Sequence, residues 1–137
     1  MPEPGEVLCD DQFQFSDGTK GKKLFIVLNN AGVGEPCLVV KTTSQVRRYT
    51  NTQVGCNPQK KVFYVITSAG VFTQNTFIQL DEIFPYHPDE LLTGYWQKRI
   101  KQVSKLPDLI LRQLKNCLKK LKQDIPEKYY RMIFAKS

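Results

Sequence analysis

The side chains of this sequence that could do chemistry are mainly cationic and hydroxylic. Lys22 and Lys23 come directly before an apolar run, and Thr42, Thr43 and Ser44 come directly after a second run. A cation stabilises negative charge that develops on a phosphate, and hydroxyl groups can hydrogen-bond to phosphate oxygens. If the two strand ends meet in space, these residues predict a phosphate-sized site that works without a metal ion. Lysines and threonines with only structural roles are also common at strand ends.

Other familiar chemistries lack the residues they need. The Gly32-x-Gly34 pair is too short for a phosphate-binding loop, and no Lys-Ser/Thr pair follows it. His87 is the only histidine, and its Tyr-His-Pro-Asp context is typical of a surface or capping residue rather than a catalytic triad. The proton acceptor for a phosphate reaction stays open, because four acidic residues are candidates: Glu6, Asp10, Asp11 and Asp17.

The cysteines predict neither a metal site nor a bound cofactor. They are scattered and form no CxxC pair, so we expect reduced thiols packed as small apolar side chains at Cys9, Cys37, Cys56 and Cys117. No apolar run approaches the ~20 residues that a membrane span needs. The N-terminal residues MPEPGEV contain no basic patch followed by an apolar run. We therefore expect a cytoplasmic protein without a membrane segment.

Strands are expected first along the chain and helices last. The 137 residues suit a single domain, residues 1–137, with a β-barrel over 1–86 and a basic helical segment over 87–137. Continuous apolar runs predict strands that are buried on both faces. Short strands with Pro and Gly at the turns favour a small barrel. The expected strands are 6–9, 22–29, 37–43, 62–66 and 76–80.

From Pro88 onward the apolar period changes to that of a helix. One predicted helical face carries Leu92, Tyr95, Trp96, Arg99 and Val103. A second helix after Pro107 has an apolar stripe that faces either the core or a second subunit: Ile110, Leu111, Leu114, Cys117, Leu118 and Leu121. The apolar segment 128–134 is expected to pack back onto the body.

Positive charge is concentrated in the C-terminal third. Residues 97–137 carry twelve Lys/Arg and three Asp/Glu, a net +9, whereas residues 1–96 carry eight and ten, a net −2. Such a block attracts phosphate backbones or acidic protein segments, or it is a solvated helix face. The polar segment 45–61 contains Arg47, Arg48 and Tyr49, which could hold a phosphate and stack a base. Alternatively, this segment is a mobile surface loop.

Four segments, in this order, resemble the PemK/MazF family of bacterial toxin endoribonucleases: PGEVL, DG…KGKKLFIVLN, CLVVKTTS and TFIQLDEIF. The resemblance implies a mainly β protein with C-terminal helices, built as a small SH3-like barrel. It also implies a homodimer that cleaves single-stranded RNA without metal, through attack by the ribose 2′-hydroxyl, and an antitoxin protein as partner. The family's key arginine falls on Lys23 and its key threonine on Thr43. Lys22, Thr42, Ser44, Arg47, Arg48 and Tyr49 would then contact RNA.

The sequence departs from the family pattern at two points. Lys23-Leu24 stands in place of Arg-Pro, and Lys41 stands in place of the proline of the threonine motif. Lysine keeps the positive charge but lacks the bidentate fork of arginine. Three interpretations follow: an active divergent enzyme, an enzyme with a different substrate range, or a non-catalytic barrel that binds nucleic acid or an acidic protein. An assembly protein that dimerises through the leucine stripe is a further alternative.

Overall fold

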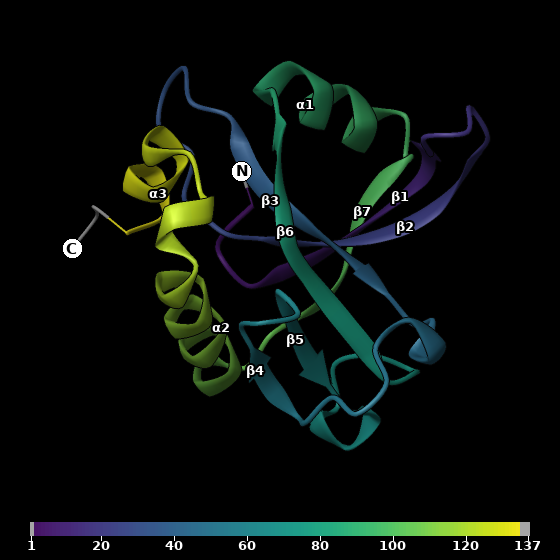
Figure 1. Ribbon diagram of the computed structural model, residues 1–137. Coiled ribbons are helices and arrows are strands. Elements are labelled where there is room, and N and C mark those ends of the chain that lie inside the picture. Colours follow the sequence, from purple (N-terminus) through teal and green to yellow (C-terminus); the bar gives the residue numbers. More distant parts are fainter. Residues whose placement is uncertain (1, 135–137) are drawn as a thin grey trace.

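Seven strands form one antiparallel sheet in the computed structural model of this chain, which describes residues 2–134 (Figure 1). The spatial order is β4-β5-β6-β3-β2-β1-β7. The strands are β1 Glu6–Gln14, β2 Lys20–Val27, β3 Cys37–Thr43, β4 Gly55–Asn57, β5 Val62–Val65, β6 Thr76–Tyr86 and β7 Ile100–Lys105. The mainly β class with helices toward the C-terminus is therefore confirmed. The sheet is not a closed barrel, since β4 and β7 stand at its two edges.

The apolar runs of β2 and β3 are buried on both faces, as predicted from their continuous hydrophobicity. Alternate residues belong to two separate cores, because successive side chains of a strand point to opposite faces. Ile26 and Val40 pack in the core under helices α2 (Asp108–Lys120) and α3 (Glu127–Phe134). Phe25 and Val39 pack in the core under helix α1 (Pro88–Trp96). Figure 1 shows α2 and α3 together on one side and α1 apart from them.

The C-terminal part contains a strand that the periodicity did not predict. Helix α1, Pro88–Trp96, ends early, and β7 then pairs with β1 at the sheet edge. Lys98 has a positive φ of 58°, which reverses the chain between the two elements. The predicted helical face through Arg99 and Val103 is therefore wrong, as is a wholly helical 87–137 segment. The apolar residues of this segment recur at the helical period, but α1 ends at Trp96 and the residues after it pair with strand β1 instead.

The buried side of α1 also differs from the predicted one. Leu91 and Gly94 face the sheet, while Leu92 and Trp96 are 58% and 90% exposed. A Cβ on Gly94 would collide with the side chain of Ile100. The helix can therefore approach β7 closely only because residue 94 is glycine.

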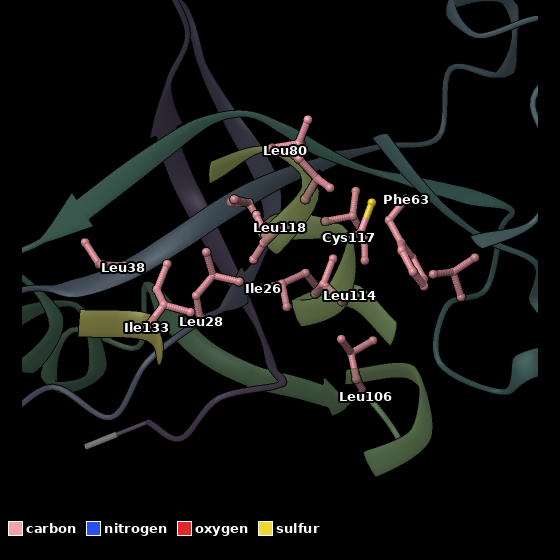
Figure 2. Packing of buried hydrophobic residues seen from close by; sticks show 14 of the residues in the cluster. Ile26, Leu28, Leu38, Phe63, Leu80, Leu106, Leu114, Cys117, Leu118 and Ile133 are labelled. Atoms are coloured by element: carbon pink, nitrogen blue, oxygen red, sulfur yellow. The ribbon is translucent and has the colours of Figure 1, made fainter. Parts of the chain in front are cut away.

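Helix α2, Asp108–Lys120, packs its apolar stripe into the larger core (Figure 2). Leu114, Cys117 and Leu118 are essentially inaccessible to solvent. The stripe is thus core, and the interpretation of it as a subunit contact is wrong. Helix α3, Glu127–Phe134, buries Met132 and Ile133 on the same core, which confirms that this segment packs back onto the body. Short 3-10 turns complete the structure: η1 Val46–Arg48, η2 Thr67–Ala69 and η3 Lys122–Asp124.

A disulfide bond joins Cys56 of β4 to Cys117 of α2. The prediction that all four cysteines are reduced thiols is therefore wrong for this pair. Their spacing in the sequence gave no signal, because the residues are 61 positions apart and only the packing of α2 on the sheet brings them together. Cys9 and Cys37 are free and buried, as expected. No helix within residues 2–134 is both long and apolar enough to cross a membrane.

Candidate functional site

The ends of β2 and β3 that carry the predicted site residues lie side by side. The paired register includes Phe25 opposite Lys41. Beyond that pair, the Thr42 hydroxyl donates a hydrogen bond to the backbone carbonyl of Leu24 over 3.1 Å. This contact keeps the two chains adjacent after their ladder ends. Continuing the same register puts Lys23 beside Thr43, which is the meeting of strand ends that the sequence analysis required.

One groove of about 610 Å³ collects the predicted phosphate-binding residues. All five of them, from both strand ends, are on its wall: Lys22, Lys23, Thr42, Thr43 and Ser44. The rest of the lining is apolar or uncharged: Val7, Cys9, Phe15, Leu24, Gln45, Val71, Phe72, Thr73, Gln74, Thr76, Val103 and Ser104. The lysines are therefore the charged side chains of this groove. The sequence analysis did not predict three of these lining residues: Phe15, Val71 and Phe72. They belong to segments that fold over the strand ends, and no local sequence pattern indicates this folding.

Lys23 is a partly desolvated cation. Its burial lowers the pKa of its ammonium group, and the nearby positive charges of Lys41 and Arg48 lower it further. The Nζ atom lies 6.0 Å from the centre of the Phe15 ring. Among the residues the structure describes, no carboxylate lies within ion-pairing distance of Lys23. An incoming phosphate would supply the missing negative charge, and the lowered pKa makes this group a better proton donor.

The three hydroxyl groups differ in their availability. Thr42 uses its hydroxyl hydrogen on Leu24. Thr43 accepts a hydrogen bond from the backbone N–H of Gln45 over 3.2 Å, and within residues 2–134 its own hydrogen has no acceptor. Ser44 is exposed at the rim. Thr43 is consequently oriented by the protein while its hydrogen remains available to an anion.

The acidic candidates are engaged elsewhere, and none of them lines the groove. Asp10 lies opposite Lys23 in the β1–β2 ladder, yet its buried carboxylate accepts hydrogen bonds from Tyr86 at 3.0 Å and from Arg99 at 3.2 Å. Burial and the Asp10 carboxylate raise the pKa of Tyr86, so the phenol stays a donor. This set of groups holds β1, β6 and the α1–β7 turn together, which is a structural task.

The remaining acidic and thiol groups have equally local roles. Asp11 pairs with Lys101 at 4.0 Å, and Glu6 accepts a hydrogen bond from the backbone of Glu3 at 2.8 Å. Hydrogen bonds from Thr19 lower the pKa of Asp17 in the β1–β2 turn. Cys9 does line the groove, but burial and a hydrogen bond to Asp11 raise its pKa, so it is a poor thiolate nucleophile.

The residues predicted in segment 45–61 lie beside the groove rather than in it. Arg47 and Tyr49 line a second groove of about 560 Å³, together with Tyr64 and Phe77. Arg48 lies over the Tyr49 ring at 5.9 Å and contributes to the positive field at Lys23. Only Ser44 and Gln45 continue the first groove toward this segment. The predicted RNA contacts other than Arg48, which lines neither groove, are therefore split between two neighbouring grooves.

No cluster of three metal-ligating side chains occurs within the described range of residues 2–134. No protein-family model matches the chain, and no curated protein sequence matches it. The function therefore has to be argued from the chemistry of the two grooves.

Proposed function

We propose that this protein is a metal-independent endoribonuclease that cleaves single-stranded RNA, built as a divergent, open form of the SH3-like PemK/MazF barrel. The observation that carries the proposal is the convergence of Lys23 and Thr43 on one groove, together with Lys22, Thr42 and Ser44. The groove presents cations and hydroxyl groups and, among its described lining residues, no carboxylate. That composition suits an anionic phosphodiester.

The reaction assigned to this groove is an intramolecular transesterification. The ribose 2′-oxygen bonds to phosphorus as the bond from phosphorus to the 5′-oxygen of the next nucleotide breaks, and the 2′-hydroxyl proton passes to water. Lys23 stabilises the negative charge on the phosphorane and gives a proton to the leaving 5′-oxygen, which its lowered pKa favours. The Thr43 hydroxyl donates to a non-bridging oxygen. The products are a 2′,3′-cyclic phosphate and a 5′-hydroxyl.

The test is cleavage of single-stranded RNA by the purified full chain in EDTA. We expect Lys23→Ala to lower the rate about 100- to 1,000-fold, the usual effect of removing one stabiliser of transition-state charge. Lys20→Ala is the matched control, because Lys20 is an exposed lysine of the same strand outside the groove. Equal cleavage by both variants, or no cleavage by the wild type, would overturn the proposal.

A homodimer and an antitoxin partner belong to the same proposal, because they come with the family resemblance. The cytoplasmic location expected from the sequence is proposed beside them. The Cys56–Cys117 disulfide counts against this location, because cytosolic reductants keep most protein thiols reduced and a cytoplasmic protein would hold the pair as thiols in the living cell. Rapid alkylation of thiols at cell lysis, followed by mass spectrometry, measures this state. Full oxidation of the pair would contradict the cytoplasmic location and leave the RNA chemistry untouched.

A non-catalytic nucleic-acid-binding protein is the second candidate, and the basic side of α2 favours it. Lys115 and Lys119 lie 5.7 and 5.5 Å from the ring of Phe134, and Lys122 lies 5.2 Å from that of Tyr130. Lysines held over aromatic rings form an ordered cationic surface. This candidate predicts RNA binding that weakens steeply with salt, without cleavage. The affinity of a Lys115→Ala/Lys119→Ala variant, measured at two salt concentrations, tests it.

A further inference from the structure

A row of paired residues links the phosphate groove to the second groove. Thr43 of β3 lies directly opposite Phe77 of β6, and Phe77 lies directly opposite Tyr64 of β5. Directly paired residues share a face of the sheet, and neighbouring strands are about 4.8 Å apart, so Thr43 and Tyr64 are about 10 Å apart. This distance is within the reach of a nucleotide in an extended strand.

The second groove is built from aromatic rings. Tyr64 stacks on Phe77 with ring centres 4.3 Å apart and an angle of 10° between the planes. Tyr49 packs on Phe77 at 5.0 Å. Phe77 is buried, whereas Tyr49 and Tyr64 are only partly covered and line the groove. The tyrosine rings are thus positioned by a buried phenylalanine and present the surface of an aromatic stack.

Polar groups surround these rings. The Gln79 side-chain amide donates a hydrogen bond to the Tyr49 hydroxyl oxygen over 3.1 Å. This bond holds the tyrosine in place, and the Tyr49 O–H is not the donor in it. Arg47 is exposed on the groove wall. The other lining residues are uncharged: Thr50, Asn51, Thr52 and Gln53. The groove therefore combines an aromatic surface with hydrogen-bonding groups and one cation.

We propose that this second groove binds one nucleobase of the RNA strand whose phosphate lies at Lys23 and Thr43, with Tyr64 and Tyr49 as the stacking surface. The inference rests on the proposed function, because it takes the first groove to be the phosphate site. Continuity along the Thr43–Phe77–Tyr64 row and the positive charge of Arg47 and Arg48 identify the occupant as a nucleotide. A proline-rich peptide could also use aromatic rings, but it would not need the adjoining cations.

The experiment uses an uncleavable 2′-O-methyl oligonucleotide, which lacks the attacking hydroxyl, and the full chain. A set of otherwise identical oligonucleotides carries a single abasic nucleotide at each position in turn. Wild-type protein should lose affinity about 5- to 150-fold at one position, the range expected for a base stacked on an aromatic side chain. The phosphates are the same in every oligonucleotide, so a uniform affinity across the set would overturn the inference.

Two variants locate the effect. Tyr64→Phe keeps the aromatic ring, so an abasic nucleotide at the sensitive position should still lower its affinity. Tyr64→Leu lacks the ring and should bind the intact and abasic oligonucleotides with equal affinity. If Tyr64→Leu does not fold, a fluorescence experiment on the wild-type protein tests the same point independently. A 2-aminopurine at the sensitive position should lose fluorescence on binding, because stacking quenches it. The absence of quenching at every position would contradict the inference, as would displacement of the oligonucleotide by a proline-rich peptide of higher affinity.

The outcomes separate this inference from the proposed function. Base-dependent binding without cleavage of ordinary RNA supports the nucleobase groove and overturns the endoribonuclease. Cleavage that is insensitive to abasic positions supports the endoribonuclease and overturns the nucleobase groove.

Discussion

The hydroxyl of Thr42 donates a hydrogen bond to the backbone carbonyl of Leu24 over 3.1 Å, beyond the last paired residues of β2 and β3. This bond fixes the relative position of two strand ends whose next residues are Lys23 and Thr43. It also gives adjacent threonines different tasks. The first holds the backbone, and the second presents its hydroxyl to the groove.

Substitution of the two threonines should therefore have different effects. Thr43→Val should slow RNA cleavage about 10- to 150-fold, because a hydrogen bond to a charged group contributes about 1.5–3 kcal/mol. Its effect on stability should be small, because the N–H that loses its acceptor belongs to the exposed residue Gln45 and can bind water instead. Thr42→Val should mainly lower the free energy of unfolding by about 1 kcal/mol. Cleavage rates and urea unfolding of both variants check this. The reverse pattern would assign the phosphate contact to Thr42.

The pH dependence of cleavage should report the protonation of Lys23. The proposed mechanism needs the charged ammonium, so activity is present below its pKa and is lost as pH rises through it. Burial and the neighbouring cations lower this pKa from the ordinary 10.5, so the loss should begin at a lower pH than for an exposed lysine. Single-turnover rates of Lys23→Arg provide the comparison. The guanidinium of the variant stays charged at high pH, so the alkaline decline in its cleavage rate should disappear. An unchanged decline would assign it to another group.

Removal of the Asp10 carboxylate should destabilise the fold strongly. Asp10→Asn leaves Arg99 without its partner at a site where Asp10 itself is only 2% exposed, and breaking such a buried pair costs about 3 kcal/mol. Asp11→Asn is the control, because its 4.0 Å ion pair with Lys101 is exposed and should contribute less than about 1 kcal/mol. Urea unfolding measures both changes, and equal losses would refute a structural role for the Asp10 cluster.

Reduction of the disulfide should lower stability. Cys56 and Cys117 are separated by 61 residues, and closing a loop of that length contributes about 4 kcal/mol in the chain-entropy treatment. Thermal unfolding with and without dithiothreitol checks this value. The Cys56→Ala/Cys117→Ala variant should be insensitive to the reductant, whereas a loss of stability in that variant would point to some other effect of dithiothreitol.

The sequence predicted well those features that depend on neighbouring residues. The continuous apolar runs of β2 and β3 predicted strands buried on both faces, and Cys37–Thr43 forms a strand with the predicted limits. The stripe through Leu114 and Leu118 predicted α2, because an apolar face repeats at the helical period. Features that depend on distant partners were missed. Strand β7 forms because β1 offers a free edge, and the disulfide forms because α2 packs beside β4.

The candidate site divides in the same way. Residue types and their order along the chain determined that lysines precede one buried strand and threonines follow another. Only the tertiary structure decided that these ends share a groove, that Thr43 rather than Thr42 keeps an available hydroxyl, and that Tyr64 and Phe77 adjoin them. The physical reason is that strand register and hydrogen-bond partners are set by contacts between segments far apart in the chain, whereas burial pattern and charge order are properties of each segment alone.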